Sequence, residues 1–244
     1  MDVVRIVLIS DTHGKHKKVD VPPGDVLIHC GDVCAGRGNS WDFRNFIKWF
    51  GAQPHKRKIL IAGNHDRCLM FDMDLCHAEL KKYPDVTYLE DTGIEIEGVK
   101  FWGSPWTPQF GDWYFMVTRG EQAKSKWDLI PDDTDVLITH GPPFGVLDLV
   151  HPHPKYNVGM NAGCEELLDA VYRRVEPIIH AFGHIHGSYG KMYLPRISLH
   201  PHTVMNPGDL PKLVGGTTFI NVATCTEFGQ PTNPPVVIDL KKEP

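Results

Sequence analysis

The sequence predicts an α/β fold. Short runs rich in β-branched residues recur along the chain, helical apolar spacing appears between some of them, and the first runs stop at glycine or polar residues. With 244 residues, of which 41% are hydrophobic and 23% charged, the chain is long enough for one large soluble domain. Because no long or biased linker interrupts it, we expect residues 1–244 to form a single domain.

Several runs have the length and composition of buried strands. They are residues 3–10, 25–30, 57–62, 93–103, 135–139, 177–182, 217–224 and 234–240. Five of them, beginning at residues 3, 25, 57, 135 and 177, are each followed at once by a polar or glycine-containing cluster. Strands partly connected by helices in this way predict apolar strands buried between helical layers.

Two stretches have the spacing of amphipathic helices. The first begins at Ser40, which we expect to be the N-cap, and its apolar residues recur at helical intervals. These residues are Phe43, Phe46, Ile47 and Phe50. A second helix is predicted over residues 164–175, with Leu167, Leu168, Val171 and Val175 facing the core.

Composition excludes some classes of partner. A net charge of -5 gives no basic field for strong nucleic-acid binding, and no apolar run approaches the roughly 18 residues of a membrane span. The six cysteines contain no CxxC pair, so free buried thiols in a reducing compartment are expected, and with them a cytoplasmic location. The oligomeric state does not follow from these features.

The polar clusters after the five strands contain residue types that bind metals. The residues are Asp11 and His13, then Asp32, then Asn64, His65 and Asp66, then His140, and finally His184 and His186. In open α/β sheets, ligands collect outside the carboxyl ends of the strands. Glycines beside several of these positions allow the backbone to approach an ion closely.

Each residue taken alone has a structural interpretation. Asp11 is then a helix cap, Asn64 a turn residue and His140 a loop histidine. The joint pattern at five strand ends favours a metal site instead. His29 and His180 lie inside apolar strands. We expect His29 to pack rather than to bind a metal, and His180 to pack in the core or to support a metal ligand from behind.

The motif set D-x-H, G-D, G-N-H-D, H and G-H-x-H resembles the calcineurin-like metallophosphoesterase superfamily. The stretches SPWTP (104–108), THGPP (139–143), GCEELLDAVYRRVEP (163–177) and INVATCTEFGQPTNPPVVIDL (220–240) are similar to one branch of it. That branch holds small metallophosphoesterase-domain-containing proteins, the brain-type phosphodiesterases with fungal and bacterial relatives. The resemblance implies a sandwich of two mixed β-sheets flanked by helices, with the metal site at the carboxyl ends of the strands.

The resemblance also implies a site with two metals. One ion is expected at Asp11, His13, Asp32 and His186, and the other at Asp32, Asn64, His140 and His184, with Asp32 bridging. Two carboxylates and a bridging hydroxide offset most of the positive charge of the two divalent ions. One net positive charge is left to attract a phosphate oxygen. Mixed imidazole and carboxylate donors suit manganese, iron or zinc rather than calcium. The bridging hydroxide is the expected nucleophile.

The resemblance assigns substrate and catalytic roles near Asn64. His65 is expected to contact phosphate together with Asn64 and to assist the leaving group, with Asp66 orienting it. For Asp66, a helix cap is an equally weighted alternative. The aromatic segment 101–115 offers Trp106, or another of its rings, for stacking on a nucleobase, against the alternative of simple packing on the sheet. The segment 151–161 is a candidate wall of the substrate entrance.

The leading functional hypothesis is a metal-dependent phosphodiesterase acting on small phosphodiesters such as cyclic nucleotides. A phosphomonoesterase is the alternative, although protein phosphatases carry GDxVDRG and GNHE where this chain has GDVCAGRGN and GNHD. A third possibility is a nucleotide-binding or scaffold protein of low turnover. Some members of the branch have glycine at the position of His184, whereas this chain fills all seven ligand positions.

Overall fold

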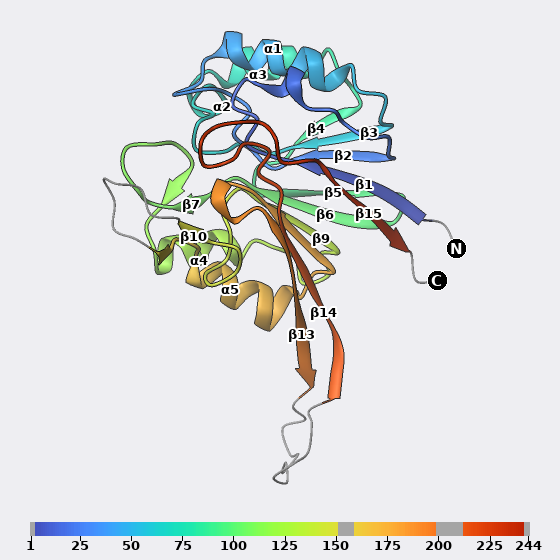
Figure 1. Cartoon of the computed structure of the whole chain (residues 1–244), viewed down its shortest axis with the longest axis vertical. Coiled ribbons are helices and arrows are strands. Elements are labelled where there is room, and N and C mark those ends of the chain that lie inside the picture. Colours follow the sequence, from blue (N-terminus) through green and yellow to red (C-terminus); the bar gives the residue numbers. More distant parts are fainter. Residues whose placement is uncertain (1–2, 151–158, 199–211, 242–244) are drawn as a thin grey trace.

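The computed structural model describes residues 3–150, 159–198 and 212–241. Two mixed β-sheets lie face to face at the centre, with helices covering the outer face of each sheet (Figure 1). The predicted fold class is therefore confirmed. Among the described residues, no helix has the length and apolar character needed to cross a membrane.

The first sheet has five strands in the order β15-β1-β2-β3-β4. Its members are β15 (Val236–Lys241), β1 (Val3–Ile9), β2 (Val26–His29), β3 (Arg57–Leu60) and β4 (Val86–Tyr88). Strands β1 to β4 are parallel, and β15 pairs antiparallel with β1. Because β1 to β4 run the same way, their carboxyl ends share one edge of the sheet.

The second sheet has six strands in the order β13-β14-β12-β9-β6-β5. They are β13 (Gly190–Ser198), β14 (Lys212–Asn221), β12 (Ile179–Phe182), β9 (Val136–Thr139), β6 (Val99–Ser104) and β5 (Thr92–Ile96). The four inner strands are parallel, and β13 and β5 are antiparallel edge strands. Strands β13 and β14 extend together beyond the rest of the sheet as a long hairpin (Figure 1).

Shorter elements connect the strands. The helices are α1 (Ser40–Gly51), α2 (Cys68–Phe71), α3 (Met73–Leu80), α4 (Glu121–Trp127) and α5 (Glu165–Ala170). A π-helical turn, η2 (Val171–Val175), continues α5, and 3-10 turns form η1 (His16–Lys18) and η3 (His186–Ser188). Two small ladders pair β7 (Thr107–Pro108) with β8 (Met116–Val117), and β10 (Leu149–Val150) with β11 (Met160–Asn161).

Strand alternation divides the core into three layers. Along β1, Val4, Ile6 and Leu8 face the space between the sheets, whereas Val7 and Ile9 pack on the side of α1 to α3. A third layer joins the second sheet to α4 and α5. Burial on both faces explains why these strands are almost continuously apolar in sequence.

The N-cap of the first helix is one residue earlier than expected. Asn39, not Ser40, is the N-cap, and its side chain accepts hydrogen bonds from the amides of Trp41 and Asp42. Asp42 completes a capping box by accepting from the Asn39 amide. The predicted buried face of this helix is confirmed at Phe43, Phe46, Ile47 and Phe50. All six cysteines are free and buried, as predicted.

His29 and His180 are completely buried, one in each sheet. The hydroxyl of Thr139 donates to the Gly141 carbonyl at 2.7 Å, so it accepts from His180 Nε2 at 2.8 Å. In the first sheet, Thr12 Oγ1 lies 3.0 Å from His29 Nε2. Burial lowers the pKa of each histidine to about 3, so both imidazoles are neutral.

Metal-free protein should lose stability below pH 6.5, the ordinary histidine pKa. The folded chain keeps these histidines neutral, but the unfolded chain binds a proton on each as the pH falls from about 6.5 towards 3. Each of the two histidines lowers the free energy of unfolding by about 1.4 kcal/mol when the pH reaches about 5.5. Urea denaturation of chelator-treated wild type and His180→Gln at two pH values measures this. The variant keeps a donor for Thr139 but should lose that part of the pH dependence, and an unchanged dependence would contradict the assignment.

Candidate metal centre

Loops after five parallel strands bring the predicted metal-binding side chains to one place between the two sheets. Asp11 and His13 follow β1, Asp32 follows β2, Asn64 follows β3, His140 follows β9, and His184 and His186 follow β12. The first four of these residues come from the five-stranded sheet and the last three from the six-stranded sheet. Asp11, Asp32, Asn64 and His140 are at most 2% exposed.

Four of these residues have a left-handed backbone conformation. The φ angles are 52° at Asp11, 44° at His13, 58° at Asp32 and 66° at His184. This conformation costs a residue other than glycine on the order of 1–3 kcal/mol. Hydrogen bonds hold the turns in place: the Asp11 amide donates to the Gly31 carbonyl at 3.0 Å, and the His184 amide donates to Asp11 Oδ2 at 2.9 Å.

Two of the glycines beside the site make room for its two carboxylates. A Cβ atom at Gly63 would lie 2.3 Å from Asp32 Oδ1, and one at Gly183 would lie 2.0 Å from Asp11 Oδ2. Both contacts are far shorter than van der Waals separations, so any side chain at either position would displace a carboxylate. The glycines therefore set how closely the loops approach the centre of the site.

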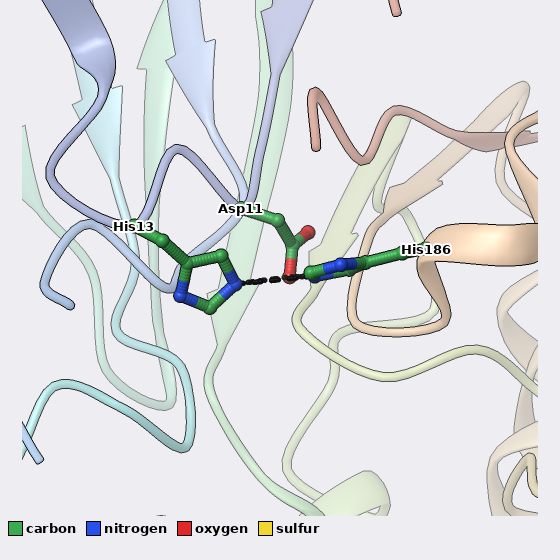
Figure 2. A group of neighbouring side chains, drawn as sticks. All are labelled: Asp11, His13 and His186. Atoms are coloured by element: carbon green, nitrogen blue, oxygen red, sulfur yellow. Dashed lines mark hydrogen bonds and ion pairs between the residues drawn. The ribbon is translucent and has the colours of Figure 1, made fainter. Parts of the chain in front are cut away.

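We call Asp11, His13 and His186 the first cluster. Figure 2 shows both imidazoles approaching the Asp11 carboxylate. His186 Nε2 lies 3.2 Å from Asp11 Oδ1, and His13 Nε2 lies 3.9 Å from the same oxygen. The two Nε2 atoms are only 3.1 Å apart.

We call Asp32, Asn64, His140 and His184 the second cluster. His140 Nε2 lies 3.3 Å from Asp32 Oδ2 and 3.0 Å from Asn64 Oδ1. Ligand atoms of Asp32, His140 and His184 all lie within 4.8 Å of one another. Asp32 also faces the first cluster, since its Oδ2 is 3.7 Å from His13 Nε2. One carboxylate thus lies between the two clusters.

The histidine tautomers make the first cluster a fit for a cation. His13 Nδ1 lies 3.3 Å from the Cys34 carbonyl oxygen, and His186 Nδ1 lies 3.2 Å from that of Thr226. A carbonyl oxygen only accepts, so each Nδ1 carries a proton and each Nε2 faces inward. Two Nε2 atoms 3.1 Å apart beside a carboxylate need a proton or a cation between them. Burial disfavours the charged His186 ring, but Asp11 outweighs this effect and raises the pKa of His186, and a metal ion would take the place of that proton.

The second cluster is also short of positive charge. His140 Nδ1 lies 2.8 Å from the Cys30 carbonyl oxygen, so its Nε2 again faces the site. Burial disfavours the charged His140 ring, but Asp32 outweighs this effect and raises the pKa of His140 to about 9. Burial likewise opposes ionisation of Asp32, and His140 nevertheless lowers the pKa of Asp32 well below its usual value. A metal ion would take the place of the His140 proton.

His65 lies at the edge of the clusters. Its Nε2 atom is 4.0 Å from Asp32 Oδ2, and its amide donates to Asp32 Oδ1 at 2.7 Å. The interaction expected between Asp66 and His65 is not among the hydrogen bonds of the described residues. His65 Nδ1 instead contacts the Gly36 carbonyl oxygen, which fixes the ring with Nε2 facing the site.

Asp66 binds backbone amides, which corrects both expectations for it. Its carboxylate accepts from Gly63 at 2.9 Å, Val33 at 3.2 Å and Cys34 at 2.9 Å. It does not cap α2, where Arg67 is the N-cap and no side chain caps the helix. Asp66 therefore joins the loops after β2 and β3, and burial, with a further contribution from Asp32, raises the pKa of Asp66 to about 7.

The aromatic segment contacts the site through rings other than Trp106. Trp106 Nε1 donates to Asp91 Oδ2 at 2.8 Å, and Lys126 Nζ lies 4.1 Å from the centre of its ring. Trp106 therefore packs against two of the core layers, which is the packing alternative that the sequence left open. The segment 151–161 falls mostly outside the described residues, which resume at residue 159.

Asn221 is a supporting residue that the sequence did not single out. It is fully buried at the end of β14, and its Nδ2 donates to the Ile185 carbonyl at 2.9 Å and to the Leu147 carbonyl at 3.3 Å. Ile185 stands between His184 and His186, so Asn221 fixes the turn that carries both histidines. The available signal was an asparagine inside the apolar stretch FINV at 219–222.

Asn221→Asp should weaken metal binding while the fold is kept. The carboxylate has no proton to donate and would face two carbonyl oxygens, so the histidine turn would shift. Loss of such a supporting contact typically lowers metal affinity about 10- to 100-fold. Competition with a chelating dye measures the affinity, and circular dichroism checks the fold. Asn233→Asp is the matched control, because Asn233 binds the Ala223 carbonyl instead. Equal affinities in both variants would contradict the role of Asn221.

Comparison with known proteins agrees with this geometry. The calcineurin-like phosphoesterase family matches residues 4–188. Human metallophosphoesterase domain-containing protein 1 is 39% identical over 97% of this chain and 71% of its own length. A UPF0046 protein of Caenorhabditis elegans is 34% identical over all of this chain and 61% of its own length.

A solved structure shares the fold at low sequence identity. The protein TT1561 of Thermus thermophilus superimposes with a TM-score of 0.55 at 13% identity, covering 79% of this chain and 85% of that one. Together with the family match and the two relatives, the clusters identify the class of protein. The chain belongs to the calcineurin-like phosphoesterase family and is a metal-dependent phosphoesterase.

Proposed function

We propose that this chain is a phosphodiesterase that hydrolyses small phosphodiesters, such as cyclic nucleotides, with two divalent transition-metal ions. The observation that carries the proposal is Asp32, whose Oδ2 lies 3.7 Å from His13 and 3.3 Å from His140. A carboxylate between two sets of inward-facing donors supports one ion in each set. The single-domain arrangement expected from the sequence is part of this proposal.

The metal ligands we propose are those that the sequence predicted. Asp11, His13, Asp32 and His186 would hold one ion, and Asp32, Asn64, His140 and His184 the other. This mixture of imidazole, carboxylate and amide donors suits manganese, iron or zinc. Two such ions, when bound, supply positive charge to phosphate oxygens and activate water for an in-line displacement.

The side chains of the site have complementary tasks in this proposal. Asn64 Oδ1 stays within the second cluster, while its neighbour His65 lies at the edge of the clusters with Nε2 4.0 Å from Asp32 Oδ2. His65 is thus in position to bind a phosphate oxygen and to give a proton to the leaving group. Since Asp66 binds backbone amides, its part is to hold the loops that carry Asp32 and Asn64.

The preference for diesters is supported by the chain's resemblance to brain-type phosphodiesterases. A phosphomonoesterase uses the same metal chemistry and is the competing assignment. The six free, buried cysteines support a reducing location, and we propose the cytoplasm. The substrate is a small phosphate ester in either case.

Purified protein loaded with manganese or zinc should hydrolyse bis(p-nitrophenyl) phosphate faster than p-nitrophenyl phosphate. Activity should disappear with chelator, and Asp32→Asn should lower kcat by at least about 100-fold because both ions lose a charged ligand. Release of p-nitrophenolate measures the rates, and a panel of cyclic nucleotides extends the comparison. A strong preference for the monoester would overturn the phosphodiesterase assignment. Absence of bound metal after loading would overturn the enzyme proposal itself.

His184→Gly should separate the two proposed metal sites. Glycine accepts the left-handed backbone at this position, so the turn is kept while one imidazole of the second cluster is lost. We expect one ion to remain bound and the affinity for the other to fall about 10- to 100-fold, with a parallel loss of turnover. Metal analysis after dialysis and rates at increasing metal concentration test this. His77→Gly, on the exposed surface of α3, is the control. Unchanged metal content and rate in His184→Gly would show that the proposed ligand division is wrong.

A further inference from the structure

We infer that Phe110 and Trp113, in the loop between β7 and β8, bind a planar aromatic ring in the organic part of the substrate. The inference deepens the proposed function and rests on it, because it concerns the same site. The loop covers residues 109–115 and lies on the side of the molecule away from the first residues of β1 and the last residues of β15 (Figure 1). It carries four aromatic residues: Phe110, Trp113, Tyr114 and Phe115.

Two of these four rings are used for packing. Phe115 is 1% exposed and belongs to the core layer under α1 to α3, and Tyr114 packs against the same layer. Within the described part of the chain, Phe110 and Trp113 belong to none of the three core layers. Their ring contacts are with histidines of the site instead.

Each of the two rings lies beside a different histidine. The Trp113 ring centre is 4.3 Å from that of His65, and the planes are inclined by 37°. The Phe110 ring centre is 5.1 Å from that of His184, a member of the second cluster. Phe110 is 42% exposed, and Trp113 is half-buried. Exposed aromatic surface beside a polar metal centre is typical of a binding site rather than of a packed loop.

The loop is attached to the site by a small set of polar contacts. The Tyr114 amide donates to the Asn64 carbonyl at 3.3 Å, which links the loop to the second cluster. Arg37 donates to Asp112 at 2.8 Å and to the Tyr114 hydroxyl at 3.3 Å, and its guanidinium lies 6.0 Å from the centre of the Trp113 ring. Arg37 therefore braces the loop from the turn whose Gly36 carbonyl orients His65.

This arrangement matches a phosphate ester whose organic group is aromatic. A phosphate bound at the two clusters would lie near both rings, since Trp113 contacts His65 and Phe110 contacts His184. An aromatic ring stacks on such surfaces regardless of its substituents. The ring is either an aryl group attached directly to phosphate or a nucleobase separated from it by a sugar. These two rings lie at different distances from the phosphate.

Binding of product-like monoesters to the metal-loaded protein tests the inference without turnover. Phenyl phosphate compared with methyl phosphate isolates a directly attached ring, and AMP compared with ribose 5-phosphate isolates a nucleobase. Calorimetry or inhibition constants give the two affinity ratios. In wild type at least one ratio should be roughly fivefold to a hundredfold, and it should fall towards one in the Phe110→Ala, Trp113→Ala double variant. The ratio that falls identifies the ring that the site accepts.

Two further variants separate ring binding from a general structural effect. Trp113→Phe keeps a ring and should retain most of the preference. Trp41→Ala removes a ring that is 67% exposed on α1, and it should leave both ratios unchanged. Ratios near one in wild type, or ratios unaltered by the double variant, would overturn the inference. If the diester is still hydrolysed in that case, the proposed function stands; if no ester binds or is hydrolysed, both fail.

Discussion

The negative charge of Asp32 at the meeting point of two sheets is the constraint on which the site depends. Asp32 follows a strand of one sheet, and its closest imidazole, His140, follows a strand of the other. The carboxylate is buried, and a buried charge is tolerated only with close partners. The turns after β1, β2, β3, β9 and β12 supply those partners, together with an excess of inward-facing acceptor atoms. The packed sheets therefore bring together donor atoms that a metal ion would bind.

Much of this arrangement follows from local sequence rules. Largely apolar runs of five to eight residues, each closely followed by Asp, Asn or His, define both the parallel strands and the side chains beyond their carboxyl ends. The seven residues from Asp11 to His186 could be named because each stands within four residues of such a run. Their grouping around Asp32 depends on how the two sheets face each other, and the sequence indicated that only through family resemblance.

The residues whose contacts the sequence did not settle share a physical reason. Asp66, Trp106 and Ser40 each have a partner that is distant or ambiguous in sequence. Asp66 finds the amides of Val33 and Cys34 some thirty residues away, and Trp106 finds Asp91 and Lys126. Ser40 and Asn39 are both good N-cap residues, and Asn39 is the cap because its backbone is extended. Composition identified the aromatic loop correctly as unusual, but only tertiary contacts separate its packing rings from those beside His65 and His184.

The left-handed backbone at His184 has an evolutionary consequence. Glycine there would remove strain of about 1–3 kcal/mol and add only about 0.4–1 kcal/mol of unfolded-chain entropy. Selection for stability alone therefore favours drift to glycine and loss of one donor from the second cluster. In the function proposed above, this strain is set against one imidazole donor of the second cluster. Paralogues that differ at this one position should thus mark the divide between lineages kept for catalysis and those kept for binding.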